Sequence, residues 1–204
     1  MKAGVLFSGG KDSALAALLL SPFAQIELVT VSFGIIPNDA ATLAQILGFH
    51  HVMISLEKEL AMNSIDTMIK DGYPNRGLNQ VHKTALERAA ECYRFVADGT
   101  RRDDKAPLLT LQEARSFEDR MHIDYIRPLL GYGRRTIDGL AVELLDVIYG
   151  ECISFDYEVE LRQLMESSYG HKTVNRVFPK KHLQSKVTGR KNANFPSGRG
   201  VNNY

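Results

Sequence analysis

Short apolar stretches recur along the chain, and each is followed by a stretch with helical spacing. The apolar stretches are rich in β-branched and aromatic residues, which suits strands buried on both faces of a parallel sheet. The predicted strands are Lys2–Phe7, Ile26–Phe33, His51–Leu56, Arg94–Ala97 and Tyr125–Leu129. The predicted helices are Ala14–Leu20, Asp39–Leu47, Leu78–Cys92, Leu111–Met121 and Thr136–Ile148. Because strand and helix alternate, we expect an α/β fold with an open, mainly parallel five-stranded sheet and helices on both of its faces.

The alternation ends near Gly150, where the strand periodicity is lost. We expect one main domain over residues 1–150 and a short basic extension over residues 151–204, because most domains contain about 100–200 residues. Within the extension, Glu151–Ser168 has a helical pattern, and the remainder is predicted to be an irregular basic tail.

Composition narrows the class of protein. Hydrophobic residues make up 44% and charged residues 24% of the 204 residues, as in globular proteins. The apolar runs are too short to cross a bilayer and no signal-peptide pattern opens the sequence, so we expect a cytoplasmic protein with no membrane partner. The two cysteines, Cys92 and Cys152, suggest neither a disulfide framework nor a zinc site with four ligands.

The hexapeptide Ser8-Gly9-Gly10-Lys11-Asp12-Ser13, here called the glycine loop, joins the first predicted strand to the first predicted helix. Glycine permits positive φ and lets anionic oxygens approach main-chain N–H groups, and a helix N-terminus attracts anions. Lys11 adds a full positive charge, and Asp12 could hold Mg²⁺ against phosphates. The loop is not a Walker A motif, because its glycine spacing differs and Asp12 follows the lysine. It predicts a phosphate site, with a merely structural capped turn as the alternative.

The glycine loop resembles the PP-loop of the ATP pyrophosphatases, also called the adenine nucleotide α-hydrolase group. The segment Ala97–Asp104 resembles the Gly-His-x-x-Asp-Asp segment of the branch that makes tRNA-lysidine and thiolated tRNA, with its glycine and two acids in register. Thr100 replaces the histidine of that segment, and Pro107 stands where a glutamate is usual. The segment Ile126–Leu130 resembles the Arg-Pro-Leu-Leu that ends the fifth strand in the same branch. The resemblance covers about residues 2 to 148.

This resemblance implies an enzyme that uses ATP and Mg²⁺. Members of the group cleave ATP between its α and β phosphates, adenylate a substrate oxygen, and let an amine or a thiol displace AMP. The implied nucleotide-binding residues are Ser8, Gly9, Gly10, Lys11, Asp12, Ser13, Ser32, Phe33, Gly99 and Thr100. The implied catalytic residues are Lys11, Asp12 and Asp104, and the implied metal ligands are Asp12 and Asp103. Without the resemblance, two adjacent acids such as Asp103 and Asp104 are more often solvated loop residues.

The tail from His171 to Tyr204 holds eight Lys or Arg residues and no acid, so the other residues of this +1 chain sum to −7. Such a one-sign segment favours an anionic partner, and RNA is the favoured one because aromatic residues lie between the cations. The RNA-binding candidates are Lys180, Lys181, Lys186, Arg190 and Lys191. The alternative is that the tail folds back on the acidic body to complete the active site or a homodimer.

Two other functions stay open. One is a nucleotide-binding sensor on the same fold without turnover, and the other is an RNA-binding module with a vestigial ATP site. Thiolation is disfavoured because the chain has no Cys-x-x-Cys pair, although Cys152 could act as a lone sulfur carrier. For His82, which lies in a helical pattern, a partly exposed structural histidine is the favoured interpretation.

Overall fold

A computed structural model describes residues 1–35, 39–150, 157–179 and 183–191. Its strands are β1 (Lys2–Leu6), β2 (Gln25–Ser32), β3 (His50–Ser55), β4 (Phe95–Ala97), β5 (Asp124–Ile126), β6 (Leu145–Gly150) and β7 (Gln184–Arg190). Its helices are α1 (Lys11–Leu20), α2 (Ala40–Leu47), α3 (Lys58–Asp71), α4 (Asn75–Ala90), α5 (Leu111–Met121), α6 (Arg134–Leu144), α7 (Tyr157–Tyr169) and α8 (His171–Val177).

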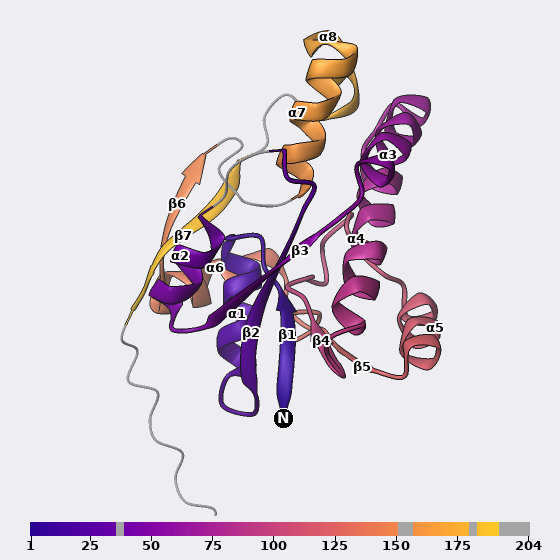
Figure 1. Cartoon of the computed structure of the whole chain (residues 1–204). Helices are drawn as coiled ribbons and strands as arrows, with labels where there is room; N and C mark the ends of the chain where they lie inside the picture. Colours follow the sequence, from indigo (N-terminus) through magenta and orange to yellow (C-terminus); the bar gives the residue numbers. More distant parts are fainter. Residues whose placement is uncertain (36–38, 151–156, 180–182, 192–204) are drawn as a thin grey trace, which may run out of the picture.

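The main sheet contains the five predicted strands in the order β3-β2-β1-β4-β5. Every neighbouring pair in it is parallel, so the predicted parallel five-stranded sheet is confirmed. Parallel strands need crossover connections, and each of these contains at least one of the helices drawn in Figure 1.

Helices cover both faces of this sheet, as predicted. On one face α1, α2 and α6 pack around Leu15 and Ile137, which are fully buried. On the other face α3, α4 and α5 pack around Leu86 and Phe117, and α7 joins this core through Leu161. In Figure 1 the two groups of helices lie on opposite sides of the sheet.

Strand β1 is the central strand, and the chain adds β2 and β3 on one side of it before it adds β4 and β5 on the other. It pairs with β2 on one side and with β4 on the other. Ligands of open α/β sheets bind beyond the carboxyl ends of the strands at such a switch point, where the two loops diverge. The glycine loop follows β1 and the Asp98–Asp104 segment follows β4, so the fold places both predicted motifs at that crevice.

The last predicted helix, Thr136–Ile148, was predicted to end too late in the sequence. Helix α6 stops at Leu144 because Leu145 is already extended, with φ −135° and ψ 148°, and the chain continues as β6. The β-branched and aromatic residues of Leu145–Gly150 favour a strand, but the partner that stabilises it lies far away in the sequence.

That partner is β7, which corrects the prediction of an irregular tail. β7 pairs with β6 in an antiparallel ladder that spans the expected boundary at Gly150, and α8 precedes it. The prediction also missed α3 between the third strand and α4. Among the described residues, no helix is both long enough and apolar enough to cross a membrane.

Strand β7 should contribute to the stability of the whole domain. Val187 has no exposed surface and packs in the same core as α1 and α6. We expect Val187→Ala to lower the free energy of unfolding by about 1.5–3 kcal/mol, from lost burial and the cavity left behind. Thr188→Ala is the matched control, because Thr188 is exposed on the same strand. Urea denaturation measures both; equal stability of the two variants would mean that the tail does not belong to the core.

Candidate functional site

The glycine loop is a tight turn held by its own two serines. Gly9 has a φ of +77°, which glycine adopts without strain, and Gly10 is the extended residue before α1. The Ser13 hydroxyl donates to the carbonyl oxygen of Gly10 at 3.1 Å and accepts from the Ser8 N–H at 3.3 Å. The Ser8 hydroxyl accepts from the Gly10 N–H at 3.3 Å. The serines therefore fix the shape of the turn.

Strand β7 closes over the outer side of this loop. The Ser185 hydroxyl accepts from the N–H of Lys11 at 3.1 Å, and the Val187 N–H donates to the carbonyl oxygen of Gly9 at 2.9 Å. A helix N-terminus has unpaired N–H donors, and Ser185 satisfies one of them. Residues 183–191 therefore fold back on the body of the protein, which was the alternative to a tail that binds RNA.

Lys11 is almost fully buried, with 6% of its surface exposed, and lies between two carboxylates. Its Nζ is 3.1 Å from Oδ1 of Asp12 and 3.4 Å from Oδ1 of Asp138 on α6. Burial raises the pKa of the Asp12 carboxyl above its usual value, although the charges of Lys11 and Arg101 act in the opposite direction. The loop thus holds a desolvated lysine beside an acid that is costly to keep ionised.

Arg101 is surrounded by the three acids predicted to act in catalysis or metal binding. Its Nε lies 3.5 Å from Oδ2 of Asp12 and 3.8 Å from Oδ1 of Asp103. Its Nη2 donates to Oδ1 of Asp104 at 2.5 Å, and its backbone N–H donates to Oδ2 of the same residue at 2.7 Å. Asp104 is therefore partly buried and paired, whereas a freely solvated loop residue was the alternative.

Asp103 has a local structural partner. Its Oδ2 accepts from the N–H of Arg134, the first residue of α6, at 2.9 Å. This hydrogen bond, followed by the charge of Arg101, holds the pKa of the Asp103 carboxyl below its usual value. Asp103 thus caps the N-terminus of α6 across the crevice from the glycine loop.

Asp12 fits a magnesium ion better than Asp103 does. The described residues contain no cluster of three or more His, Cys, Asp or Glu side chains that could hold a metal by themselves. Asp12 Oδ1 is nevertheless a buried oxygen without a hydrogen-bond partner there, although Lys11 lies nearby. Mg²⁺ is usually held by one or two carboxylates together with phosphate oxygens and water, a mode that one aspartate can serve.

Gly99 packs directly against the glycine loop. A Cβ on Gly99 would lie 2.6 Å from the carbonyl carbon of Asp12 and 2.7 Å from the backbone nitrogen of Ser13. Only glycine lets the two loops approach this closely. The next residue, Thr100, donates through its N–H and its hydroxyl to Oδ1 of Asp98, at 2.9 Å and 2.7 Å.

Asp98 is the centre of a buried polar network that also contains His82. It is 2% exposed and accepts from His82 Nε2 at 2.9 Å and from the hydroxyl of Tyr125. Burial alone would raise the pKa of Asp98, but the hydrogen bonds and charge of His82, with those of Tyr125 and Thr100, hold it below its usual value. His82 itself is 4% exposed, so the expectation of a partly exposed histidine is wrong.

The end of β2 is paired with the C-terminal extension. Glu160 on α7 is 2% exposed; its Oε1 accepts from the Ser32 hydroxyl at 2.9 Å, and its Oε2 from the Phe33 N–H at 2.7 Å. The Ile35 N–H donates to Oε1 of the same carboxylate at 2.9 Å. The assignment of Ser32 and Phe33 to the nucleotide stays a prediction, and these donors are available to a base only if Glu160 moves.

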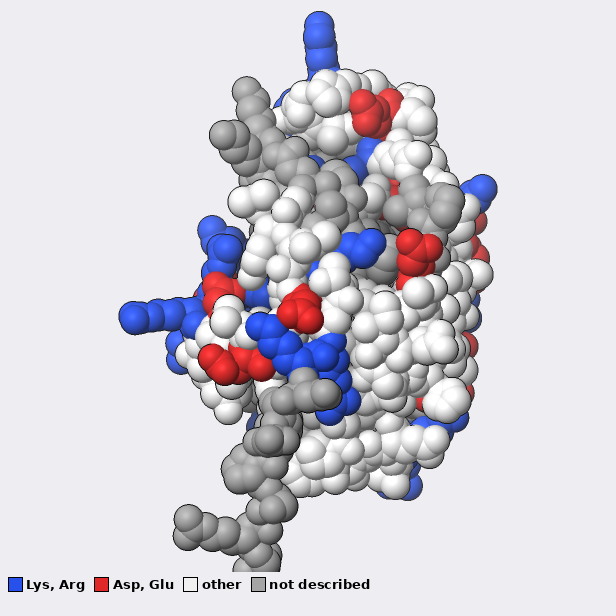
Figure 2. All heavy atoms as spheres, turned by 90° about the vertical axis from the view of Figure 1, so that its left-hand side faces the viewer, with Lys and Arg blue, Asp and Glu red and all other residues white. Residues whose placement is uncertain are grey.

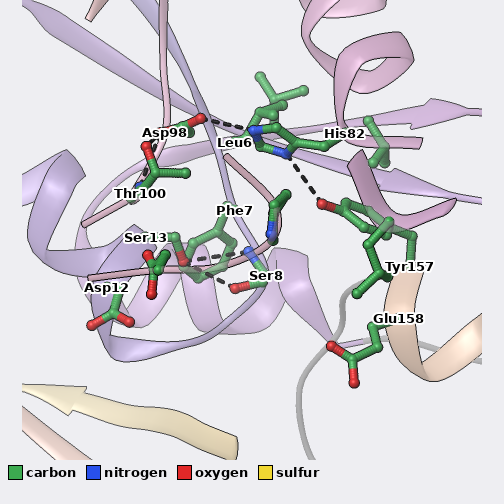
Figure 3. Close-up of a pocket in the computed structure, with 16 residues that line it drawn as sticks. Leu6, Phe7, Ser8, Asp12, Ser13, His82, Asp98, Thr100, Tyr157 and Glu158 are labelled. Atoms are coloured by element: carbon green, nitrogen blue, oxygen red, sulfur yellow. Dashed lines mark hydrogen bonds and ion pairs between the residues drawn. The ribbon is translucent and has the colours of Figure 1, made fainter. Parts of the chain in front are cut away.

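A pocket of about 170 Å³ joins these parts of the crevice (Figure 3). Its polar wall contains the loop residues Ser8, Asp12 and Ser13, with His82 opposite them. Its apolar wall is formed by Leu6, Phe7, Val29, Val31, Leu78 and Pro107. A pocket with an apolar wall and a few convergent polar groups is typical of a binding site for an organic ligand.

A second, more polar cavity of about 270 Å³ lies on the other side of the loop, toward the β6–β7 ladder. Its charged lining residues are the cations Lys11, Arg101 and Arg134 and the acids Asp12 and Glu158, and Ser185 of β7 also lines it. Three cations at a helix N-terminus favour an anion there. The two cavities meet at the glycine loop, because Ser8 and Asp12 line both.

The described RNA-binding candidates lie on the folded strand. Lys186 and Arg190 belong to β7, Lys191 follows it, and Lys180 and Lys181 lie outside the described residues. Arg190 donates to the carbonyl oxygen of Leu47 and Lys191 to that of Val142. Figure 2 views this side of the molecule and shows Lys and Arg side chains mixed with Asp and Glu.

A family described as one of unknown function, DUF7411, matches residues 1–189. The chain belongs to this family. MJ0690, an uncharacterized protein of Methanocaldococcus jannaschii, is 41% identical over 197 residues, which cover 94% of this chain and 97% of the relative. A crystal structure from the same organism, described as a predicted subunit of tRNA methyltransferase, is 40% identical with a TM-score of 0.86, over 94% of this chain and 98% of that one. NMN synthetase of Francisella tularensis is 17% identical with a TM-score of 0.45, over 69% of this chain and 60% of that one.

Sequence reasoning missed the contributions of the C-terminal extension to the site. Tyr157 and Glu158 of α7 line the apolar pocket, Glu160 reaches β2, and Ser185 reaches the loop. A signal exists for α7, because Tyr157, Glu160 and Leu161 recur at i, i+3 and i+4 and therefore share one helix face. Glu160 is polar although it is buried, so the spacing of apolar residues does not mark it as part of the buried face of α7.

The close approach at Gly99 leads to a prediction about the loop. Gly99→Ala should lower the free energy of unfolding by about 1–3 kcal/mol and displace the glycine loop, because the new methyl group would overlap backbone atoms. Gly131→Ala is the matched control, since a Cβ there meets no atom within 4 Å. Urea denaturation and hydrogen exchange of the loop amides measure the effect; identical behaviour of the two variants would contradict the close contact.

Proposed function

We propose that this protein binds ATP at the glycine loop and cleaves it between the α and β phosphates to adenylate an acceptor. The observation that carries the proposal is the buried Lys11 at the N-terminus of α1, which lines a cavity with two further cations next to an apolar pocket. An apolar pocket suits a nucleoside, and a cationic cavity suits a polyphosphate. The resemblance of the loop to the PP-loop supports the same assignment.

The chain's own residues can meet the electrostatic demands of this reaction. Cleavage at the α phosphate develops negative charge on the leaving pyrophosphate, and Lys11, Arg101 and Arg134 line the cavity where that charge would lie. Asp12 would hold Mg²⁺, which when bound neutralises phosphate charge. Asp104 fixes Arg101 through two hydrogen bonds and thereby orients its guanidinium.

The test of this assignment uses ATP labelled at the α phosphate. We expect AMP and pyrophosphate as products in the presence of Mg²⁺ and a fractionated cell extract that supplies the acceptor. Lys11→Ala should weaken ATP binding by about 1.5–3 kcal/mol, the contribution of a charge-assisted hydrogen bond. Lys172→Ala on α8 is the matched control, because Lys172 is exposed.

Two outcomes of this experiment distinguish the alternatives. ADP and phosphate as products would contradict the PP-loop assignment. Tight ATP binding without release of pyrophosphate in any fraction would favour the nucleotide-binding sensor.

We further propose that the acceptor is carried on tRNA. One support is that Lys186 and Arg190 belong to β7, the strand whose Ser185 and Val187 contact the glycine loop. The other is the description of the 40%-identical protein as a predicted subunit of tRNA methyltransferase. The backbone of RNA is bound largely by Lys and Arg, which release counterions from it.

The salt dependence of tRNA binding tests this proposal. If about half of the eight tail cations contact phosphates, the slope of log affinity against log salt should be roughly −3. Replacing Lys186, Arg190 and Lys191 together by alanine should reduce that slope by roughly 2, at about 0.7 per contact. Lys172→Ala with Arg176→Ala is the control on α8. Full-length protein that never binds tRNA at low salt would contradict the proposal.

A further inference from the structure

A chain of three side chains leads from the buried interior to the apolar pocket. Asp98 accepts from Nε2 of His82 at 2.9 Å, and Nδ1 of the same ring lies 3.1 Å from the hydroxyl oxygen of Tyr157. Asp98 and His82 are 2% and 4% exposed, whereas Tyr157 is partly exposed on the pocket wall. Figure 3 shows His82 between the two, with the Tyr157 hydroxyl turned toward its ring.

The hydrogen bonds fix which proton each group carries. Asp98 is already the acceptor for the N–H and hydroxyl of Thr100 and for the hydroxyl of Tyr125. A carboxylate that accepts all these bonds stays ionised, so Nε2 of His82 must carry the hydrogen that points to it. When this imidazole is neutral, its Nδ1 is an acceptor, and the hydrogen between the two rings then belongs to Tyr157.

Tyr157 is placed where a ligand of the pocket would meet it. Ser8, Asp12 and Ser13 of the glycine loop line the same pocket, so a nucleotide on the loop would lie beside the tyrosine. The other ionisable groups that line this pocket are Asp104 and Glu158. Asp104 is paired with Arg101, and Glu158 accepts from Arg162 at 2.8 Å, so each already has an arginine partner.

We propose that Tyr157 is the acid–base catalytic residue of the displacement step, and that His82 and Asp98 are positioning residues that make its oxygen basic. This inference rests on the proposed function. The amine, thiol or water that displaces AMP forms a bond to the adenylated carbon, and the bond from that carbon to the AMP oxygen breaks with its electron pair. The proton of the nucleophile passes to the Tyr157 oxygen while the tyrosine proton passes to Nδ1 of His82.

The positive charge formed on His82 is stabilised by Asp98. The ionised carboxylate lies against Nε2 in a water-poor environment, where such an interaction is stronger than in water. The arrangement follows the logic of the serine hydrolase triad, in which a buried aspartate orients a histidine that accepts a hydroxyl proton. The proton returns from His82 through Tyr157 to the released AMP or to water, which restores the starting state.

The experiment follows AMP release from α-labelled ATP with Mg²⁺ by the full-length protein, together with the extract fraction that supplies the acceptor. Tyr157→Phe and His82→Gln should each lower kcat by about 10²–10⁴-fold, the usual contribution of general acid–base catalysis, with the Kd for ATP changed less than twofold. Glutamine keeps a donor for Asp98 but offers no basic nitrogen to the tyrosine. Tyr169→Phe is the matched control, since Tyr169 lies at the other end of α7 and its hydroxyl donates to Asp66 on α3.

A spectroscopic measurement separates the relay from a merely structural role. In protein labelled with ¹⁵N-histidine, the His82 ring should carry its hydrogen on Nε2, and Asp98→Asn should change that tautomer while ATP still binds. Wild-type protein with the hydrogen on Nδ1 would overturn the proposal, as would AMP release by Tyr157→Phe and His82→Gln at the wild-type rate. Wild-type protein that makes ADP instead of AMP would overturn the proposed function, and the relay with it.

Discussion

The site depends on one close approach of two backbones. Gly99, just beyond β4, lies against the carbonyl carbon of Asp12 and the nitrogen of Ser13, where no side chain fits. This contact joins the loops that follow β1 and β4 at the point where the strand order reverses. Because it fixes the glycine loop against the segment that carries Asp98, it also fixes the phosphate cavity relative to the buried polar network.

Positive and negative side chains alternate around the two loops that this contact joins. Lys11 lies between Asp12 and Asp138, and Arg101 lies among Asp12, Asp103 and Asp104. Each of these two cations has acidic neighbours, which offset the cost of burying its charge. A polyphosphate with Mg²⁺ would replace these internal pairings with similar ones. Burial raises the pKa of Asp12, because a buried carboxylate is costly to keep ionised, and a bound cation would offset that cost.

The sequence predicted the parts of this arrangement that depend on local pattern. The five strands were recognisable because their apolar runs are short and each is followed by a helical pattern, and the glycine loop was recognisable because six informative residues are contiguous. Strand β6 was missed because its partner β7 lies more than 30 residues along the chain, a pairing that no local pattern reports. Ser185 and Tyr157 were missed for the same reason, since each meets the site only through tertiary packing.

The C-terminal extension emerges as part of the site. Its helix α7 supplies Tyr157 and Glu160, and its strand β7 supplies Ser185, so the extension encloses the crevice from two directions. In Figure 1, α7 and the β6–β7 ladder lie on either side of the carboxyl edge of the sheet. Enclosure of this kind would limit the contact of a bound ligand with bulk water.

The central claim is that ATP is attacked at its α phosphorus, and the most direct test measures which phosphorus is attacked. Hydrolysis of ATP by the protein in ¹⁸O-labelled water, with Mg²⁺ and analysis of the products by mass spectrometry, reads that position without knowledge of the natural acceptor. We predict one ¹⁸O atom in AMP and none in pyrophosphate, because attack occurs at the α phosphorus. Label in pyrophosphate, or ADP with labelled phosphate, would contradict the account.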